Sequence, residues 1–201
     1  MIKNVIFDCG KVLIQYDEVM IASHFTENGA DAEILGKVGM ARKYWDNFDR
    51  GVLAEPEYLS EVKKELPEHL HSAVEKLSEA WISLCPPIPG MEEIVCDLKN
   101  AGVKLYLLSN FNKRLRHEQH YISALKYFDG LVISAEVQKV KPDRDVYEYL
   151  LSAHALNPKE CIFVDDNPAN IAAGESVGIK GYLFDGDAEK LRAYLKAENL
   201  L

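Results

Sequence analysis

Five short runs of apolar residues recur along the chain, and each has the length of a buried β-strand. Strands that are buried on both faces of a parallel sheet show such continuous runs in place of strict alternation. Longer segments with a helical spacing of apolar residues separate the last four runs. The five predicted strands are Val5–Phe7, Val103–Leu108, Leu131–Ile133, Cys161–Val164 and Gly181–Phe184.

The segment between the first and second strands has a different pattern, because residues 16–85 contain helical spacing and no convincing strand. Asn28-Gly29 is expected to end the first helix, and a proline-rich stretch from Cys85 to Gly90 stops the last one. The predicted helices lie at about 19–25, 34–41, 58–66 and 69–84.

Strands that alternate with helices are typical of an α/β fold with a doubly wound parallel sheet. The sequence therefore predicts a core of residues 1–15 and 86–201, with residues 16–85 inserted after the first strand as a small helical cap. We interpret the stiff connection at Cys85–Gly90 as the boundary or hinge between the two parts.

Composition restricts the class of protein further. The chain has 201 residues, of which 48% are hydrophobic and 27% are charged, as in an ordinary soluble globular protein. The formal net charge of −9 argues against binding to nucleic acid or to an anionic membrane surface. No targeting segment or long apolar run is visible, so a cytoplasmic location is expected. The four cysteines lack paired spacing, which gives a zinc site little support.

Polar side chains follow the predicted strands at equivalent positions. Asp8, Ser109-Asn110 and Asp165-Asp166 come at or just after strand ends, and Lys141 lies shortly after the third strand. The carboxyl ends of parallel strands meet in one crevice, so these groups are expected to converge there. Three neighbouring carboxylates repel one another unless a cation lies among them, and hard oxygen ligands suit Mg²⁺. A carboxylate nucleophile opposite a metal and a lysine is an arrangement for phosphoryl transfer.

These residues carry a family resemblance that covers nearly the whole chain. Four ordered segments resemble the motifs of the haloacid dehalogenase-like hydrolases: Phe7–Leu13, Leu107–Asn110, Lys141–Asp143 with Tyr147, and Val164–Asn167 with Asn170, Ala173 and Gly178. Most members of that family are Mg²⁺-dependent phosphatases with a cap. The inserted residues 16–85 resemble its small cap.

The resemblance implies a role for each matching residue. Asp8 would be the nucleophile, Ser109 and Asn110 would bind phosphate, and Lys141 would both bind phosphate and stabilise the developing charge. Metal ligands would be Asp8, Asp166 and the main-chain carbonyl of Gly10, with Asp165 acting through water or behind the ligands.

Gly10 departs from the family pattern, in which a second aspartate two residues after the nucleophile protonates the leaving oxygen and then activates water. A carboxylate in that role contributes about 10²–10⁴-fold to the rate. Its absence predicts a slow enzyme, a substrate with a good leaving group, or an acid supplied from elsewhere. Some small-cap members have a similar Asp-x-Gly pattern and resemble sugar-phosphate phosphatases.

The cap stretch Tyr44–Gly51 contains aromatic and charged residues that could recognise a polar ligand. We favour packing of Trp45 and Phe48 in the cap interior, with Asp49 and Arg50 paired on the surface. Arg50 is still the best candidate for a cap residue that reaches the substrate. Lys113 is a candidate on the core side, although a solvated helical turn explains it equally well.

The sequence therefore predicts a Mg²⁺-dependent phosphatase of a small phosphorylated metabolite, with a sugar phosphate as the candidate substrate, acting through an aspartyl-phosphate. One alternative is a phosphate-binding or regulatory protein whose catalysis is impaired by Gly10. A metal-independent dehalogenase typically has an aromatic residue at that position, and a phosphomutase needs the second aspartate. Both are therefore less favoured.

Overall fold

The computed structural model describes all residues from Met1 to Leu201 and contains one five-stranded sheet. Its strand order is β3-β2-β1-β4-β5, and every neighbouring pair is parallel. The strands are β1 (Asn4–Phe7), β2 (Lys104–Ser109), β3 (Gly130–Ile133), β4 (Cys161–Asp165) and β5 (Lys180–Leu183). The prediction of a doubly wound parallel sheet is confirmed, and each predicted strand is present within one or two residues.

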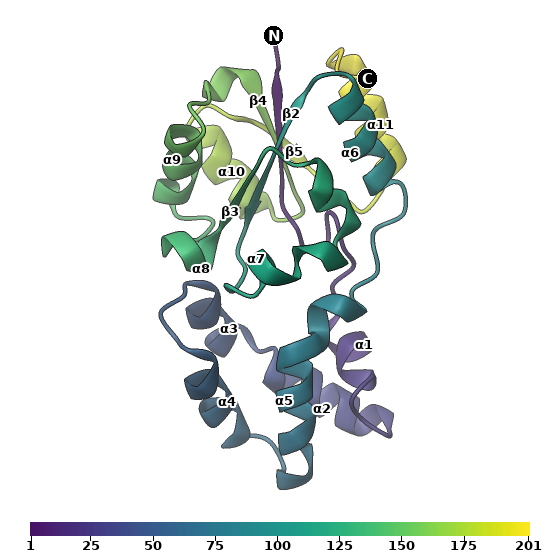
Figure 1. The fold of residues 1–201 in the computed structure, drawn as a ribbon, viewed down its shortest axis with the longest axis vertical. Helices are drawn as coiled ribbons and strands as arrows, with labels where there is room; N and C mark the ends of the chain where they lie inside the picture. The colour runs from purple at the N-terminus through teal and green to yellow at the C-terminus, as the bar shows by residue number, and fades with distance from the viewer.

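Helices cover both faces of the sheet, with α6 and α11 on one side and α9 and α10 on the other (Figure 1). The core helices are α6 (Met91–Asn100), α7 (Leu115–Glu118), α8 (Ser134–Val137), α9 (Arg144–Ala153), α10 (Pro168–Ser176) and α11 (Ala188–Ala197). Short 3₁₀ helices are η3 (Gln119–Tyr121), η4 (Ser123–Tyr127) and η5 (Pro158–Glu160). The helix α9 begins at Arg144, two residues after Pro142.

The central strand β1 contributes to both layers of the core, because successive side chains of a strand point to opposite faces. Val5 and Phe7 belong to the larger cluster of buried apolar residues, whereas Ile6 belongs to the smaller cluster that α9 covers. All four residues of β1 are buried. This burial on both faces explains why the strand is a continuous apolar run.

The helices that precede α6 in the segment between β1 and β2 gather at the carboxyl ends of the strands (Figure 1). They are α1 (Glu18–Ser23), α2 (Gly29–Gly39), α3 (Arg42–Asp49), α4 (Glu55–Lys63) and α5 (His71–Ala80), with the 3₁₀ helices η1 (Glu68–Leu70) and η2 (Trp81–Leu84). We propose that this group is the cap of residues 16–85. No helix of the chain has both the length and the apolar character that spanning a membrane requires.

In this segment one expected helix boundary was wrong, and one helix was absent from the prediction. Asn28-Gly29 begins α2 and does not end the helix before it, because the Asn28 side chain accepts a hydrogen bond from the Asp31 N–H at 2.9 Å. The helix α3 was not predicted. Its buried aromatic residues Trp45 and Phe48 pack with Tyr58 at ring-centroid distances of 5.1–6.3 Å, which confirms the predicted interior packing of these two side chains.

Apolar and polar contacts join these helices to the sheet-bearing part. The Trp81 ring in η2 stacks on Phe111, which follows β2, with ring centroids 4.9 Å apart. Arg114 donates hydrogen bonds to Glu55 in α4 at 3.2 and 3.3 Å. The helices α1 to α5, with η1 and η2, therefore lie at the end of the sheet at which the candidate residues emerge.

Candidate active site

The register of the sheet brings the predicted residues to one place. Phe7 lies opposite Leu107 on one side and Val164 on the other, so Asp8, Ser109 and Asp165 emerge at the same edge. The Asp8 N–H extends the ladder by donating to the carbonyl of Val164 at 2.9 Å. Together with Lys141 and residues of the helices above, this edge borders a cavity of about 840 Å³.

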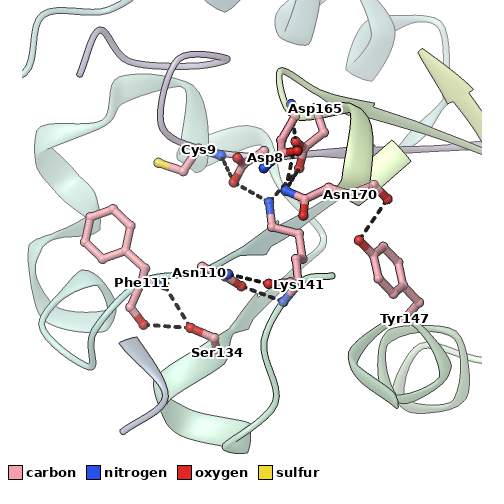
Figure 2. Close-up of polar contacts among 10 residues, drawn as sticks. Asp8, Cys9, Asn110, Phe111, Ser134, Lys141, Tyr147, Asp165 and Asn170 are labelled. Atoms are coloured by element: carbon pink, nitrogen blue, oxygen red, sulfur yellow. Dashed lines mark hydrogen bonds and ion pairs between the residues drawn. The ribbon is translucent and has the colours of Figure 1, made fainter. Parts of the chain in front are cut away.

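Lys141 joins the two strand-end carboxylates. Its Nζ lies 2.8 Å from Asp8 Oδ1 and 2.7 Å from Asp165 Oδ2, and the Lys141 side chain is only 1% exposed. Figure 2 shows the ammonium group pointing between the two carboxylates. Burial alone would lower the pKa of Lys141, but the charges of Asp8 and Asp165 outweigh burial, and the pKa is raised. Lys141 is therefore a buried cation that pairs with both Asp8 and Asp165.

Asn110 fixes the main chain of Lys141. Its Nδ2 donates to the Lys141 carbonyl and its Oδ1 accepts from the Lys141 N–H, each at 2.8 Å (Figure 2). The side-chain amide of Asn110 is thus engaged on both sides. This geometry favours a positioning function for Asn110 over direct contact of its amide with phosphate.

The adjacent aspartates at the end of β4 have different surroundings. Asp165 is fully buried, and it accepts hydrogen bonds from Asn170 Nδ2 at 3.0 and 3.1 Å and from the Asn167 N–H at 2.8 Å. Burial and the charge of Asp8 raise the pKa of Asp165 to about 6. Asp166 borders the cavity, and the same two causes raise its pKa. Asp165 anchors Lys141, whereas Asp166 is free to face a ligand.

The carboxylates form a group with the chemistry of a cation site. One oxygen each from Asp8, Asp165 and Asp166 lies within 4.8 Å of the others. Asp8 and Asp165 share the ammonium of Lys141, whereas Asp166 has no ion-pair partner, so a divalent cation would offset the repulsion among the three carboxylates. These oxygen donors fit Mg²⁺, and the predicted ligands Asp8, Gly10 and Asp166 all border the cavity.

The remaining candidate residues differ in whether they border the cavity. Ser109 is buried and borders the cavity. Arg50 also borders it, but its Nη1 lies 3.2 Å from Asp143 Oδ2 and not on Asp49, so the expected surface pair is wrong. Lys113 is exposed and lies outside the cavity lining. Cys9 is fully buried, and its sulfur points away from Asp8 in Figure 2.

Asp49 was expected on the surface, and sequence reasoning missed its place in the cavity. Asp49, at the end of α3, is buried, borders the cavity and leaves its Oδ1 without a hydrogen-bond partner. The spacing of Trp45, Phe48 and Asp49 could have indicated this burial. Their positions i, i+3 and i+4 share one helix face. Two aromatic residues on that face therefore predict that Asp49 is buried with them.

The structure is thus an α/β fold with a doubly wound sheet. The buried Lys141 contacts the aspartate that follows the central strand, and two adjacent aspartates lie at the end of β4. The family model for haloacid dehalogenase-like hydrolases matches residues 2–178. The chain belongs to this family, and the predicted resemblance is confirmed.

Similar proteins extend over nearly the whole chain. The sesquiterpene phosphatase of Aspergillus oryzae is 28% identical over 184 residues, with 89% of this chain and 88% of that protein covered. The D-ribitol-5-phosphate phosphatase of Bacteroides thetaiotaomicron is 24% identical over 198 residues, with 94% and 95% covered. A solved family enzyme from the same bacterium, in complex with magnesium and inorganic phosphate, has a TM-score of 0.72 at 20% identity, with 95% of this chain and 99% of that chain covered.

Proposed function

We propose that the protein is a Mg²⁺-dependent phosphatase of a small phosphorylated metabolite and that Asp8 is its nucleophile. The observation that carries this proposal is the pairing of Asp8 with the buried Lys141, beside Asp165 and Asp166, in one cavity. The family membership and the phosphatase names of the similar proteins support the same reaction class.

In the proposed reaction, an Asp8 carboxylate oxygen attacks phosphorus and the bond to the leaving oxygen breaks, which gives an aspartyl-phosphate. Lys141 offsets the charge of the phosphoryl oxygens, and Ser109 binds one of them. Asp165 and Asn110 hold Lys141 in place through the contacts described above. Mg²⁺, held by Asp8, Asp166 and the Gly10 carbonyl, would supply Lewis-acid stabilisation of the same charge. Water then releases phosphate and frees Asp8.

The lining of the cavity favours a polar substrate. Most lining residues are polar or charged, and the apolar ones include Met40, Trp45, Trp81 and Phe111. A sugar phosphate fits this balance better than a prenyl phosphate, because a long apolar chain would face unpaired polar groups. We therefore propose a phosphorylated sugar or polyol as the substrate class.

Phosphate release from a panel of substrates tests the proposed function. We expect turnover of p-nitrophenyl phosphate and of at least one sugar or polyol phosphate with Mg²⁺, and loss of turnover with excess EDTA. Equal rates with and without the metal would contradict the metal requirement. No release from any substrate would favour the phosphate-binding or regulatory alternative, and fluoride release from fluoroacetate without metal would favour the dehalogenase.

Mg²⁺ is expected to stabilise the folded protein, because it binds carboxylates that are brought together only in the folded state. With free Mg²⁺ about 100-fold above its Kd, the free energy of unfolding should rise by about 2.7 kcal/mol. Thermal unfolding with and without Mg²⁺ measures this shift. Asp166→Asn should reduce the shift, whereas Asp185→Asn, an exposed residue paired with Lys190, should leave it unchanged. An equal shift in both variants would place the cation elsewhere.

A further inference from the structure

Asp49 is a buried carboxylate for which the main chain and side chains of the protein provide no partner. The residue is 7% exposed, and Oδ1 has no hydrogen-bond partner. Burial of an unpaired charge is costly, so a group in this situation either finds a ligand or takes up a proton. Because Asp49 borders the same cavity as Asp8 and Gly10, its carboxyl group is available to a ligand bound there.

Contacts with the core hold the end of α3 at the cavity that Asp8 also borders. The carbonyl of Asp49 accepts a hydrogen bond from Ser134 Oγ at 2.5 Å, and Ser134 Oγ in turn accepts from the Phe111 N–H at 2.9 Å. Gly51 has φ +69°, and a Cβ there would lie 2.3 Å from the carbonyl oxygen of Ala135. Main-chain docking on α8 therefore fixes where the Asp49 side chain stands relative to β1 and β2.

The surroundings of Asp49 favour a proton on its carboxyl group near neutral pH. Burial is the largest cause that raises its pKa, Arg42 partly offsets this increase, and the charges of Asp46 and Asp8 add to it, so that the pKa of Asp49 is about 7. Asp49 is also the last residue of α3, where the negative end of the helix dipole disfavours another negative charge. A carboxyl group that exchanges a proton near pH 7 has the property that a general acid and base requires.

The family pattern has a carboxylate at the position of Gly10, where it acts as the general acid and base. Glycine has no group that could do this. We propose that Asp49 supplies the missing function as the general acid and base for the reaction at Asp8, delivered from the cap side of the cavity. The inference rests on the proposed phosphatase function.

The proposed proton transfers balance over one turnover. In the first step Asp8 forms a bond to phosphorus, the bond to the leaving oxygen breaks, and the Asp49 carboxylic acid gives its proton to that oxygen. In the second step the Asp49 carboxylate takes a proton from water as the water oxygen bonds to phosphorus. The bond between Asp8 and phosphorus breaks, and Asp49 is again protonated.

The alternative is that Asp49 only binds a hydroxyl group of the substrate. Two aryl-containing substrates distinguish such binding from proton transfer by Asp49. p-Nitrophenyl phosphate has a leaving group that needs little protonation, whereas benzyl phosphate, of similar size, releases an alkoxide that needs a proton. Neither offers a sugar hydroxyl. We expect Asp49→Asn to lower kcat/KM for benzyl phosphate by about 10²–10⁴-fold and for p-nitrophenyl phosphate by less than about tenfold.

The second step gives an independent signature. Without a base for water, Asp49→Asn should accumulate the aspartyl-phosphate and show a pre-steady-state burst of p-nitrophenolate that approaches one equivalent per active site. The control is Asp185→Asn, whose exposed carboxylate pairs with Lys190 and does not border this cavity. It should retain the wild-type ratio of the two substrates and add no burst.

The pH profile is a third readout. Asp49 faces Arg42 and Asp46 on its own helix, Asp8 at the end of β1, and Tyr16 in the segment that follows β1. The acid form exists below its pKa, so wild-type kcat/KM for benzyl phosphate should fall as pH rises through about 7. This descending limb should be absent in Asp49→Asn.

A carboxylate at position 10 should compensate. A Cβ at Gly10 would approach only the Tyr16 Cβ, at 3.9 Å, so the backbone accepts a side chain there. Gly10→Asp combined with Asp49→Asn should recover at least about tenfold of the lost benzyl phosphate activity, within the range of one acid/base group. Gly10→Ala combined with Asp49→Asn should recover none.

The outcomes separate this inference from the proposed function. If wild-type protein turns over neither substrate, the phosphatase proposal fails. If wild type is active but Asp49→Asn lowers both substrates equally, or neither, and shows no burst, the acid/base inference is overturned while the phosphatase proposal stands. The selective loss, the burst and the rescue by Gly10→Asp together would establish it.

Discussion

Asp8→Asn is expected to lower phosphate release by at least about 10³-fold, because an amide oxygen is a poor nucleophile and cannot form the aspartyl-phosphate. The loss should appear with p-nitrophenyl phosphate as well as with sugar phosphates, in contrast to the selective loss expected for Asp49→Asn. Acid quenching of wild type during turnover, followed by mass analysis of the peptide that contains Asp8, should show one phosphoryl group that is absent in the variant.

The folded structure should tolerate this change. Lys141 keeps its contact with Asp165 at 2.7 Å, and the charge of Asp8, which raises the pKa of Asp165, is removed. Without Mg²⁺, the unfolding temperature of Asp8→Asn should therefore equal or exceed that of wild type. A variant that keeps wild-type turnover would exclude Asp8 as the nucleophile, and one that loses activity together with its fold would require another substitution at the same position.

The sequence was sufficient to place the strand-end residues because two independent rules agree there. Short apolar runs that alternate with helical segments indicate the buried strands of a parallel sheet, and the carboxyl ends of parallel strands meet. Asp8 follows β1 and Asp165 ends β4, so their proximity depends only on adjacent strands being in register. The roles that the family resemblance assigns to these residues stay predictions, which the substitutions above test.

The surroundings of Asp49 and Arg50 could not be predicted in the same way. Adjacent side chains on a helix point in different directions. A pair between Asp49 and Arg50 is therefore not expected once α3 is recognised. Arg50 instead contacts Asp143, 93 positions away in the chain. Such a contact depends on how α3 docks on the core, which local spacing does not specify.

Asn110 illustrates a second limit. A motif position next to Ser109 indicates that the residue belongs to the site, but not which of its atoms are already engaged. Both polar atoms of the Asn110 side chain are used on the main chain of Lys141, a partner 31 positions away. Assigning a residue to contact with phosphate or to positioning therefore requires the hydrogen-bond partners.

Lys141→Met is expected to lower the free energy of unfolding by about 3–5 kcal/mol, since removal of one partner from a buried ion pair leaves an uncompensated charge. Here two carboxylates lose the same cation, and Asp165 is fully buried beside Lys141. Methionine fills the volume of the lysine stem, so lost charge and not a cavity should dominate. Urea unfolding in Mg²⁺-free buffer measures the change. The matched control is Lys139→Met, whose exposed pair with Asp145 should contribute less than about 1 kcal/mol.

A second substitution separates charge from packing in this prediction. Asp165→Asn removes the buried negative charge and keeps an oxygen that accepts from Asn170 Nδ2. The double variant Lys141→Met with Asp165→Asn should therefore recover much of the lost stability, and its phosphatase activity should stay low because the cation beside Asp8 is still missing. If the double variant is no more stable than Lys141→Met, packing of the lysine stem dominates, and the ion pair of Lys141 with Asp165 is not what stabilises this edge of the sheet.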